Sequence, residues 1–523
     1  MTQFKSGLAA LLAATAMISA PAMADTVVLS DGDGGIQIRG KLIGFEDGTY
    51  TIDTAIGRLT LAAANISCEG DACPDLTPQG YRVAGSRAIT DFLLPNILTS
   101  YTAQYGGGQM INTDIVNSAF AVGEGLTEPN VFVEGTDTST GLGKLYAGEA
   151  DLAMASRPAR NREVRMFDEA GKGALRTFEQ EHVIALDALV IATHPENPVR
   201  AISELNAALV FGGAISNWRE IGGREAPINL YVREDGSGTR EIFDNLLMRP
   251  NGLTVAGGGN VTVLPDDEKV AEAVAQDPFG IGFTSFAQLG DASGLAIEGV
   301  CGLRTPPTAH TIQTEEYPLT RLLYAYQANG QLPNSAQMLL DFVETEAGQT
   351  AIAEAGFINQ QVDEIPLNSQ GLRIASAVVT NDDPFEFASM REMVGLLMNA
   401  DRLTTTFRFE TGSSRLTARS EADLGRLADL MERDAFANKE VIFVGFTDSV
   451  GKADLNQQLS AQRADEVRRT LLQRFPDLRG RARTRAIGYG EISPLGCNET
   501  DNGRRINRRV EVWVQDIATK GRL

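Results

Sequence analysis

The sequence predicts a multidomain protein with a small N-terminal β domain, a larger two-lobed α/β domain and a C-terminal α/β domain. The first observation is length, because 523 residues are too many for one core at ~150 residues per domain. The second is that residues 25–78 read as short strands separated by Asp-Gly turns. The third is that strands and helices alternate over residues 79–364 and again over residues 401–523, with residues 365–400 expected as a connector.

The N-terminal residues predict an exported protein. Residues 1–24 contain Lys5, a short apolar run and an Ala-x-Ala ending, which is the pattern of a cleavable signal peptide, so Asp25 is the expected mature N-terminus. No later stretch approaches 18 consecutive apolar residues, and we expect a soluble protein in the periplasm. The net charge of -22 argues against nucleic-acid binding but leaves room for a local anion site.

The cysteines and histidines predict one disulfide, no metal and no cofactor. Cys68 and Cys73 are close enough for a local disulfide, which would stabilise the small β domain by about 2–3 kcal/mol. Cys301 and Cys497 either pair with each other or stay free, and spacing does not decide between these alternatives. The three histidines lack metal-ligand spacing. For the N-terminal β domain, an adaptor role and a purely structural role both stay open.

One strand-to-helix turn of the middle domain has the composition of an anion site. An apolar strand over residues 228–232 ends at Arg233, and a Gly-Ser-Gly-Thr turn over residues 236–239 then leads into a helical pattern. A helix N-terminus offers unsatisfied N–H groups, glycines permit close approach, and an arginine can form a fork with an oxyanion. Asp235 is a candidate for holding that fork in position. Taken alone, such a turn is as often purely structural as it is a ligand site.

Three further turns of this domain place hydroxyl or arginine side chains where ligand groups belong in open α/β sheets. They follow the strands at residues 81–84, 130–134 and 150–155, and they contain the segments 85–87, 135–142 and 156–158. Four such turns in chain order favour a shared site in one cleft over chance placement.

The middle domain resembles the phosphate-binding proteins of bacterial ABC uptake systems, which are two-lobed, type II-like periplasmic binding proteins. The resemblance covers about residues 79–364 and extends to the segments 187–192, 211–218, 280–283 and 317–321. It implies that the protein closes around phosphate, with these binding residues: Ser86, Arg87, Ala88, Thr138, Ser139, Ser156, Arg233, Ser237, Gly238 and Thr239.

Two residues depart from that family's pattern. Ser156 stands where the best-known member has an aspartate, and Arg87 stands where a small hydroxyl residue is common. An aspartate can accept the proton of hydrogen phosphate and reject sulfate, whereas a serine does so less decisively. Phosphate is therefore the leading ligand, and other oxyanions or a phosphorylated small molecule stay open.

The C-terminal domain presents a carboxylate and a guanidinium in consecutive elements. A strand over residues 440–445 is followed by Thr447 and Asp448, and the next helix has apolar residues at four-residue steps that Arg463 interrupts. A guanidinium in an apolar row needs a partner, and Asp448 is the candidate.

This stretch resembles the OmpA-type peptidoglycan-binding domain, matched by residues 445–448, 456–464, 488–491 and 498–510. The resemblance implies that Asp448 takes the ammonium group and Arg463 the carboxylate group of diaminopimelate in the stem peptide. Phe446 replaces a histidine common in the family, and a structural Asp–Arg bridge in a degenerate domain is the alternative. The expected peptidoglycan-binding residues, with Arg508 supporting the ligand's neighbourhood, are Thr447, Asp448, Asn456, Leu459, Arg463 and Arg508.

These observations predict a non-enzymatic periplasmic receptor for phosphate that is tethered to peptidoglycan near the outer membrane. It would serve phosphate uptake or sensing, with an ABC permease as the candidate partner. Two alternatives stay open: an envelope scaffold whose receptor domain has lost its ligand, and a phosphate-ester hydrolase. The hydrolase would need a nucleophile beside a base or metal, and no histidine or carboxylate cluster neighbours Ser237 in the sequence.

Overall fold

The computed structural model describes residues 26–31, 37–46, 49–55, 57–62, 66–70, 72–73, 80–105, 110–112, 117–121, 129–235, 237–330, 332–365, 370–371, 384–409 and 416–517. The predicted signal peptide at residues 1–24 lies outside this part of the chain. The protein divides into two compact units, Met1–Thr77 and Pro78–Leu523, which are described separately.

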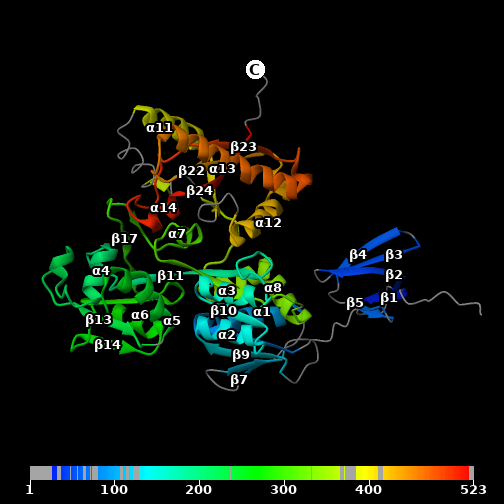
Figure 1. Ribbon diagram of the computed structural model, residues 1–523, viewed down its shortest axis with the longest axis horizontal. Helices are drawn as coiled ribbons and strands as arrows, with labels where there is room; N and C mark the ends of the chain where they lie inside the picture. Colours follow the sequence, from blue (N-terminus) through cyan, green and yellow to red (C-terminus); the bar gives the residue numbers. More distant parts are fainter. Residues whose placement is uncertain are drawn as a thin grey trace, which may run out of the picture. The chain divides into compact units, whose positions relative to one another are not determined.

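The N-terminal unit is an antiparallel sheet with the strand order β4-β3-β2-β1-β5 (Figure 1). Alternating residues such as Val27 and Leu29 point to one face, where they pack with Tyr50 and Ile52 in a small core. A disulfide joins Cys68 to Cys73 beside this core, as the sequence predicts. The strands are β1 (Thr26–Asp31), β2 (Gln37–Glu46), β3 (Thr49–Thr54), β4 (Gly57–Ala62) and β5 (Ile66–Glu69).

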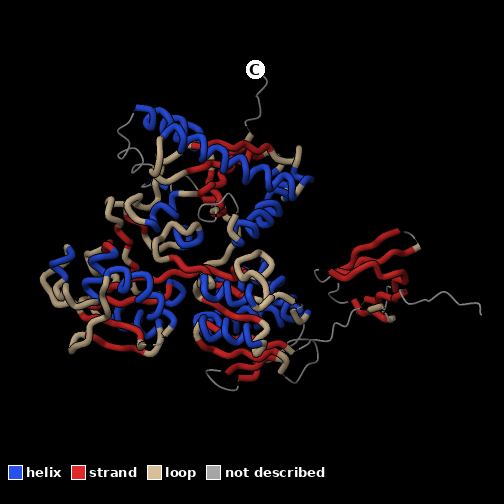
Figure 2. Tube along the Cα trace, in the orientation of Figure 1, coloured by secondary structure: helices blue, strands red, loops and turns tan. Residues whose placement is uncertain are grey.

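The middle domain has two lobes that share one sheet, with the order β14-β13-β15-β11-β19-β10-β6-β9-β8-β7. Figure 2 shows helices packed around the strands of both lobes. Lobe 1 contains β6 (Tyr81–Ser86), η1 (Ala88–Leu93), α1 (Leu94–Tyr105), β7 (Met110–Asn112), β8 (Asn117–Phe120), β9 (Val131–Thr136), α2 (Thr138–Ala147), β10 (Leu152–Ala155), α3 (Asn161–Glu169), β19 (Thr320–Tyr326), α8 (Asn334–Glu344) and α9 (Glu346–Glu354).

Lobe 2 is built from the chain between β11, which runs through both lobes, and β19. It contains β12 (Ala201–Ser203), α4 (Glu204–Phe211), η2 (Trp218–Ile221), β13 (Asn229–Arg233), α5 (Gly238–Phe243), η3 (Asp244–Met248), η4 (Arg249–Asn251), β14 (Val261–Leu264), α6 (Asp267–Gln276), β15 (Gly280–Ser285), η5 (Phe286–Gln288), β16 (Ser293–Gly294), β17 (Ala296–Glu298), β18 (Arg304–Thr305) and α7 (Ala309–Gln313).

Strand β11 (Glu181–Thr193) connects the lobes. Its first part pairs with β19 from Glu181 to Ala188, and its last part pairs with β15 from Leu189 to Thr193. It is buried from Val183 onward, which explains its nearly continuous apolar sequence. At the junction, Asp187 accepts hydrogen bonds from Arg321 at 2.5 Å and from Ser285 at 2.7 Å, so the buried charges are paired where the lobes meet.

The C-terminal domain is a sheet with the order β20-β21-β24-β22-β23 between two layers of helix. Successive residues of β22 alternate between these layers, because strand side chains point to opposite faces. Val441 and Phe443 pack with α12 and α13, whereas Ile442 and Val444 pack with α11. The elements are β20 (Glu364–Ile365), α11 (Pro384–Leu397), β21 (Asp401–Phe407), α12 (Ala418–Glu432), η7 (Asp434–Phe436), β22 (Lys439–Phe446), α13 (Ala453–Arg474), η8 (Pro476–Leu478), β23 (Arg483–Gly488), α14 (Asp501–Asn507) and β24 (Arg509–Asp516).

Residues 365–400, expected as a connector, contain α11, whose Met390 and Met393 contribute to this domain's core. The predicted architecture of an N-terminal β region, a two-lobed α/β domain and a C-terminal α/β domain is confirmed. Among the described residues, each helix falls short of the length and apolar character that a membrane crossing requires.

Candidate anion-binding and wall-binding sites

In lobe 1, three buried hydroxyl residues follow neighbouring parallel strands. Ser86 ends β6, Thr138 follows β9 and Ser156 follows β10, and β6 lies between the other two strands. The backbone N–H of Ser156 donates to Thr138 Oγ1 at 3.1 Å, and the two side-chain oxygens are 3.5 Å apart. The structure therefore brings Thr138 and Ser156 together at the edge of the sheet where the sequence places ligand groups.

The start of α2 is pressed onto the end of β6. A Cβ at Gly141 would lie 2.6 Å from the Cα of Gly85, so glycine is required for this approach. Asp137 caps the helix by accepting from the N–H groups of Ser139 at 2.8 Å and Thr140 at 3.1 Å. Burial disfavours the charged carboxylate, but the bonds from Thr140 and Ser139 hold the pKa of Asp137 below its usual value. The N–H of Ser139 is thus already used within the protein.

The hydroxyl group of Ser139 faces Arg157, which belongs to the predicted turn 156–158 but not to the expected set of binding residues. Arg157 donates to Ser139 Oγ at 2.8 Å and holds Glu163 through two bonds of 2.8 and 2.9 Å. Its Nε is buried and finds no hydrogen-bond partner among the residues that the structure describes. Lobe 1 therefore presents a fixed guanidinium group with one unsatisfied donor, next in sequence to Ser156.

The other two lobe 1 residues of the prediction lie at the start of η1. Arg87 is exposed, and Ala88 is half-buried. The Arg87 side chain and the carboxylate of Asp91 both border Gly135. Burial raises the pKa of Asp91, with a smaller opposing effect from Arg87. Arg87 is therefore placed beside Asp91, with no contact to the hydroxyls of Thr138 and Ser156 among the described residues.

In lobe 2, Arg233 is held by Asp267, which the sequence analysis missed. Asp267 forms an ion pair with Arg233 Nη1 and accepts from Thr239 Oγ1 at 2.7 Å. Arg233 Nη2 donates to the carbonyl of Pro265 at 2.8 Å, while its buried Nε has no hydrogen-bond partner within the described ranges. Asp267 opens α6 directly after the residue that caps that helix, so the sequence signal resembled an ordinary N-terminal acidic pair.

The candidate role of Asp235 in holding Arg233 is wrong. The Asp235 side chain is 92% exposed and pairs with Arg240 at 3.3 Å. Its carboxylate is thus engaged by Arg240 at the surface, and Asp267 holds the half-buried guanidinium of Arg233.

Ser237, Gly238 and Thr239 form the start of α5. Ser237 caps the helix by accepting from Arg240 N–H at 3.0 Å. Ser237 and Thr239 are both buried. Across the two lobes, Arg160 at the start of α3 contacts Glu241 of α5 at 3.2 Å. This ion pair joins the lobes beside the two groups of predicted site residues.

In the C-terminal domain, Asp448 follows β22 and pairs with Arg508 at 2.6 Å. The expected direct pair with Arg463 is not formed. Arg463 instead lies over the Phe409 ring at 5.5 Å, and its buried Nη1 lacks a hydrogen-bond partner in the described part of the chain. Burial and the neighbouring Arg508 lower the pKa of Arg463, and Asp448 opposes that shift. The three charged groups are therefore close neighbours, with Arg508 in the position expected for Arg463.

The other residues of the predicted wall-binding set differ in exposure and in hydrogen bonding. Thr447 is buried, and its hydroxyl group has no partner. Asn456 donates to the carbonyl of Asp448 at 3.3 Å and to Glu491, which fixes the loop after β22. Leu459 is 39% exposed on α13.

Comparison with known families identifies the two α/β domains. Two lobes sharing crossing strands, followed by a separate α/β domain, define a bilobal binding protein with an appended module. Residues 82–345, about half of the chain, match the PBP superfamily domain, and residues 408–508 match the OmpA family. The chain belongs to the PBP superfamily and contains an OmpA-family domain, as the sequence predicts.

Individual relatives match the two domains separately. The chain is 28% identical over 235 residues to "Phosphate-binding protein PstS" of Borreliella burgdorferi, covering 42% of this chain and 76% of that protein. It is 39% identical over 114 residues to "Outer membrane porin F" of Pseudomonas aeruginosa, covering 22% of this chain and 31% of that protein. A solved ABC-type phosphate transport receptor from Vibrio cholerae aligns at 21% identity and a TM-score of 0.41, covering 53% of this chain and 99% of that one.

Proposed function

We propose that the protein binds phosphate, or a closely related oxyanion, between its two lobes, and that its C-terminal domain holds it to peptidoglycan. The observation that supports anion binding most strongly is a pair of half-buried guanidinium groups, one on each lobe. Arg157 and Arg233 each have a carboxylate partner and a buried Nε without a hydrogen-bond partner in the part of the chain that the structure describes. A buried donor without a partner costs about 1–3 kcal/mol, which an anionic oxygen can recover.

The same turns offer neutral donors to the anion. The hydroxyl groups of Thr138 and Ser156 lie on lobe 1, and those of Ser237 and Thr239 on lobe 2. On closure, these groups replace the hydration shell of the anion, and a separation of the lobes about β11 and β19 releases it. Ser86, Ala88, Ser139 and Gly238 complete the proposed site, and Arg87 contributes at its rim.

The proposed site discriminates weakly between protonated and fully ionised anions. The oxygens of Asp267 are engaged by Arg233, Thr239 and the N–H of Ser285, and position 156 is a serine. No described carboxylate of the proposed set is left to accept a proton from hydrogen phosphate. We therefore expect sulfate to compete with phosphate.

In the C-terminal domain, we propose that diaminopimelate in the wall peptide binds between Asp448 and Arg463. Its carboxylate would satisfy the buried Nη1 of Arg463 and the hydroxyl group of Thr447. Its ammonium would share Asp448 with Arg508. Asn456 holds the loop and Leu459 offers an exposed apolar contact beside it.

The proposed location is the periplasm, reached through the predicted signal peptide and retained at the cell wall beneath the outer membrane. All four cysteines form disulfides, which agrees with an oxidising compartment. The relatives of the middle domain are named as binding proteins, which agrees with a non-enzymatic receptor. An ABC permease is the proposed partner that would receive the anion.

The test is isothermal titration of the full protein with phosphate and with sulfate, combined with a phosphomonoester turnover assay. Saturable binding without turnover supports the receptor. Turnover would support the hydrolase alternative, and absence of binding to both anions would support a scaffold whose receptor domain is degenerate. Pull-down with diaminopimelate-containing peptidoglycan tests the anchor separately.

A further inference from the structure

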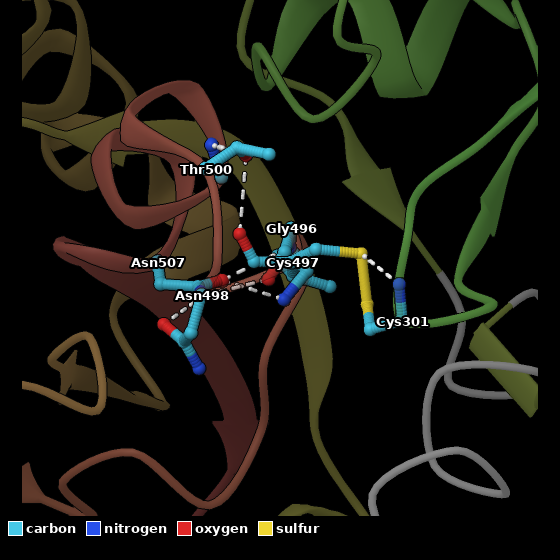
Figure 3. Close-up of a disulfide and its surroundings, with 8 residues drawn as sticks. Cys301, Gly496, Cys497, Asn498, Thr500 and Asn507 are labelled. Carbon is cyan, nitrogen blue, oxygen red and sulfur yellow. Dashed lines mark hydrogen bonds between the residues drawn. A yellow bond between two sulfur atoms is a disulfide. The ribbon is translucent and has the colours of Figure 1, made fainter. Parts of the chain in front are cut away.

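The C-terminal domain is fixed to lobe 2 by a covalent link. Cys301, in the loop between β17 and β18, forms a disulfide with Cys497 across 196 residues of sequence (Figure 3). The loop that carries Cys497 is tied to α14, because Asn507 donates to the carbonyl of Gly496 and to Asn498, both at 2.8 Å. Lobe 2 and this part of the C-terminal domain therefore move together.

A buried charge cluster next to α7 strengthens this attachment. Glu315 of lobe 2 accepts from Arg419 at 2.8 Å and from Arg505 at 3.1 Å. Arg408 donates to the carbonyl of Thr314 at 2.9 Å. Glu315 also has a positive φ of 56°, a conformation that a non-glycine residue keeps only when its surroundings hold it.

Lobe 1 is attached to the same domain by the chain that follows α9 and by side chains at its surface. That chain passes along β11, where Ile358 pairs with Leu186 and Gln360 donates to the carbonyl of Val183 at 2.7 Å, before it enters β20.

Within the described residues, the side-chain contacts of lobe 1 with this domain are Glu344 of α8 with Arg426, at 2.7 Å, and Phe178 with Arg474, at 5.6 Å from the ring centre. Glu344 is 47% exposed and Phe178 is 42% exposed. The Arg426–Glu344 ion pair is half-exposed, with Arg426 at 12%, and contributes about 1 kcal/mol. It can therefore break while the disulfide and the Glu315 cluster hold lobe 2 in place.

Helix α12 carries both attachments. Arg419, Asp423 and Arg426 lie at i, i+4 and i+7 on one face, and α12 lies next to β11 (Figure 1). Asp423 pairs with Arg426 at 2.8 Å and with Arg419 at 3.6 Å. A row of alternating charges thus runs from Glu315 on lobe 2, along α12, to Glu344 on lobe 1.

We propose that α12 couples closure of the anion-binding lobes to the C-terminal domain, with the Arg426–Glu344 pair as a latch. This inference rests on the proposed anion binding. Arg419 ties α12 to Glu315 of lobe 2. The backbone link to lobe 1 lies against β11, the strand about which the lobes would rotate, so a rotation of lobe 1 about β11 and β19 changes the distance between Arg426 and Glu344. In this structure the latch coexists with the Arg160–Glu241 pair that joins the lobes. The latch therefore stabilises the arrangement in which the lobes are together, and it raises anion affinity.

The test compares phosphate affinity of the full protein with that of Glu344→Gln, which keeps the side-chain shape and removes the charge. We expect Glu344→Gln to weaken binding roughly two- to fivefold. Glu346→Gln is the matched control, because Glu346 is exposed two residues away and has no contact with Arg426. Arg426→Gln and the double variant complete a cycle, in which the two changes should be less than additive.

A second measurement does not depend on ligand binding. Spin labels on the exposed positions Arg162 of lobe 1 and Asp291 of lobe 2 report the separation of the lobes. We expect Glu344→Gln to increase the wider-separation population without ligand. Unchanged affinity together with an unchanged distance distribution would overturn the latch and leave the receptor proposal intact. If the wild type binds neither anion, the receptor proposal fails, and the distance distribution still decides whether Arg426–Glu344 restrains the lobes.

Discussion

The two candidate sites both combine an aspartate with an arginine, but they distribute the charges differently. In lobe 2, Asp267 holds Arg233 directly, and the arginine keeps one buried N–H group free. In the C-terminal domain, Asp448 pairs with Arg508, and Arg463 is left with a buried N–H group and an aromatic neighbour. In lobe 2, the aspartate fixes the arginine in place, and the arginine can donate its remaining N–H group to an anion. In the C-terminal domain, Arg463 has no carboxylate partner of its own among the described residues, so a zwitterionic ligand can bind its carboxylate to Arg463 and its ammonium group to Asp448.

The largest effect should come from removing the carboxylate in lobe 2. Asp267→Ala leaves Arg233 charged and buried without compensation, so we expect unfolding free energy to fall by about 3–5 kcal/mol. Asp266→Ala is the control, because Asp266 only caps α6 and its loss costs about 1 kcal/mol. Urea denaturation measures both. Equal losses for the two variants would mean that Asp267 is no more than a second cap.

A third arginine–carboxylate cluster, around Glu315, should make the stability of the protein depend on pH. Burial disfavours the charged Glu315, but Arg408, Arg419 and Arg505 outweigh it and lower its pKa to about 2. Because this value lies below the usual 4.5, Glu315 adds stability that is present above about pH 5 and is lost as the pH falls toward 2. The stability difference between wild type and Glu315→Gln should shrink by about 2 kcal/mol between pH 6 and pH 3. A difference that stays constant in denaturation at both pH values would contradict this.

In the wall-binding site, the change should affect binding more than folding. Arg463→Ala should reduce peptidoglycan pull-down by about tenfold or more, because a charged fork to the ligand carboxylate is lost. Its effect on unfolding free energy should stay within about 1 kcal/mol, since no direct ion pair is broken. Arg469→Ala is the control, because Arg469 pairs only within α13 among the described residues. Full retention of pull-down by Arg463→Ala would assign this residue to packing.

The smallest effect concerns selectivity in the anion site. Ser156→Asp supplies a carboxylate that can accept the proton of hydrogen phosphate and that repels sulfate. We expect the ratio of phosphate to sulfate affinity to rise about tenfold, while the wild type shows a ratio within about tenfold of one. Competition titrations measure both ratios. A wild type that already rejects sulfate strongly would place the selectivity elsewhere.

The sequence predicts the elements and the residue types of both sites better than their pairing. Strand and turn patterns are local, so they locate Thr138, Ser156 and Arg233 at the ends of strands. The partner of Arg233 is 34 residues away in sequence and is set by the packing of α6 beside β13. Likewise, Arg508 pairs with Asp448 across 60 residues of sequence. The apolar pattern of the helix that contains Arg463 cannot reveal that Arg508 takes the carboxylate expected for Arg463.

The contacts between the lobes and the C-terminal domain could not be predicted from local sequence patterns for the same reason. Cys301 and Cys497 left two alternatives in the sequence, and the fold brings them together across 196 residues. Arg419 and Arg426 have the spacing of an ordinary solvated helix face, and only the contact of α12 with both lobes turns them into interdomain residues. Phe178 and Glu344, which complete these contacts, have no distinguishing sequence signal.

The most direct test of anion binding between the lobes is titration of phosphate into Arg233→Lys beside the wild type. Lysine keeps a positive charge for Asp267 but lacks the guanidinium Nε and its planar fork. We predict saturable binding by the wild type, affinity at least about tenfold weaker for Arg233→Lys, and wild-type affinity for Arg219→Lys, whose exposed side chain pairs with Glu225. Equal affinity of Arg233→Lys and wild type would contradict the account, because the anion would then bind without the arginine on which the lobe 2 site is built.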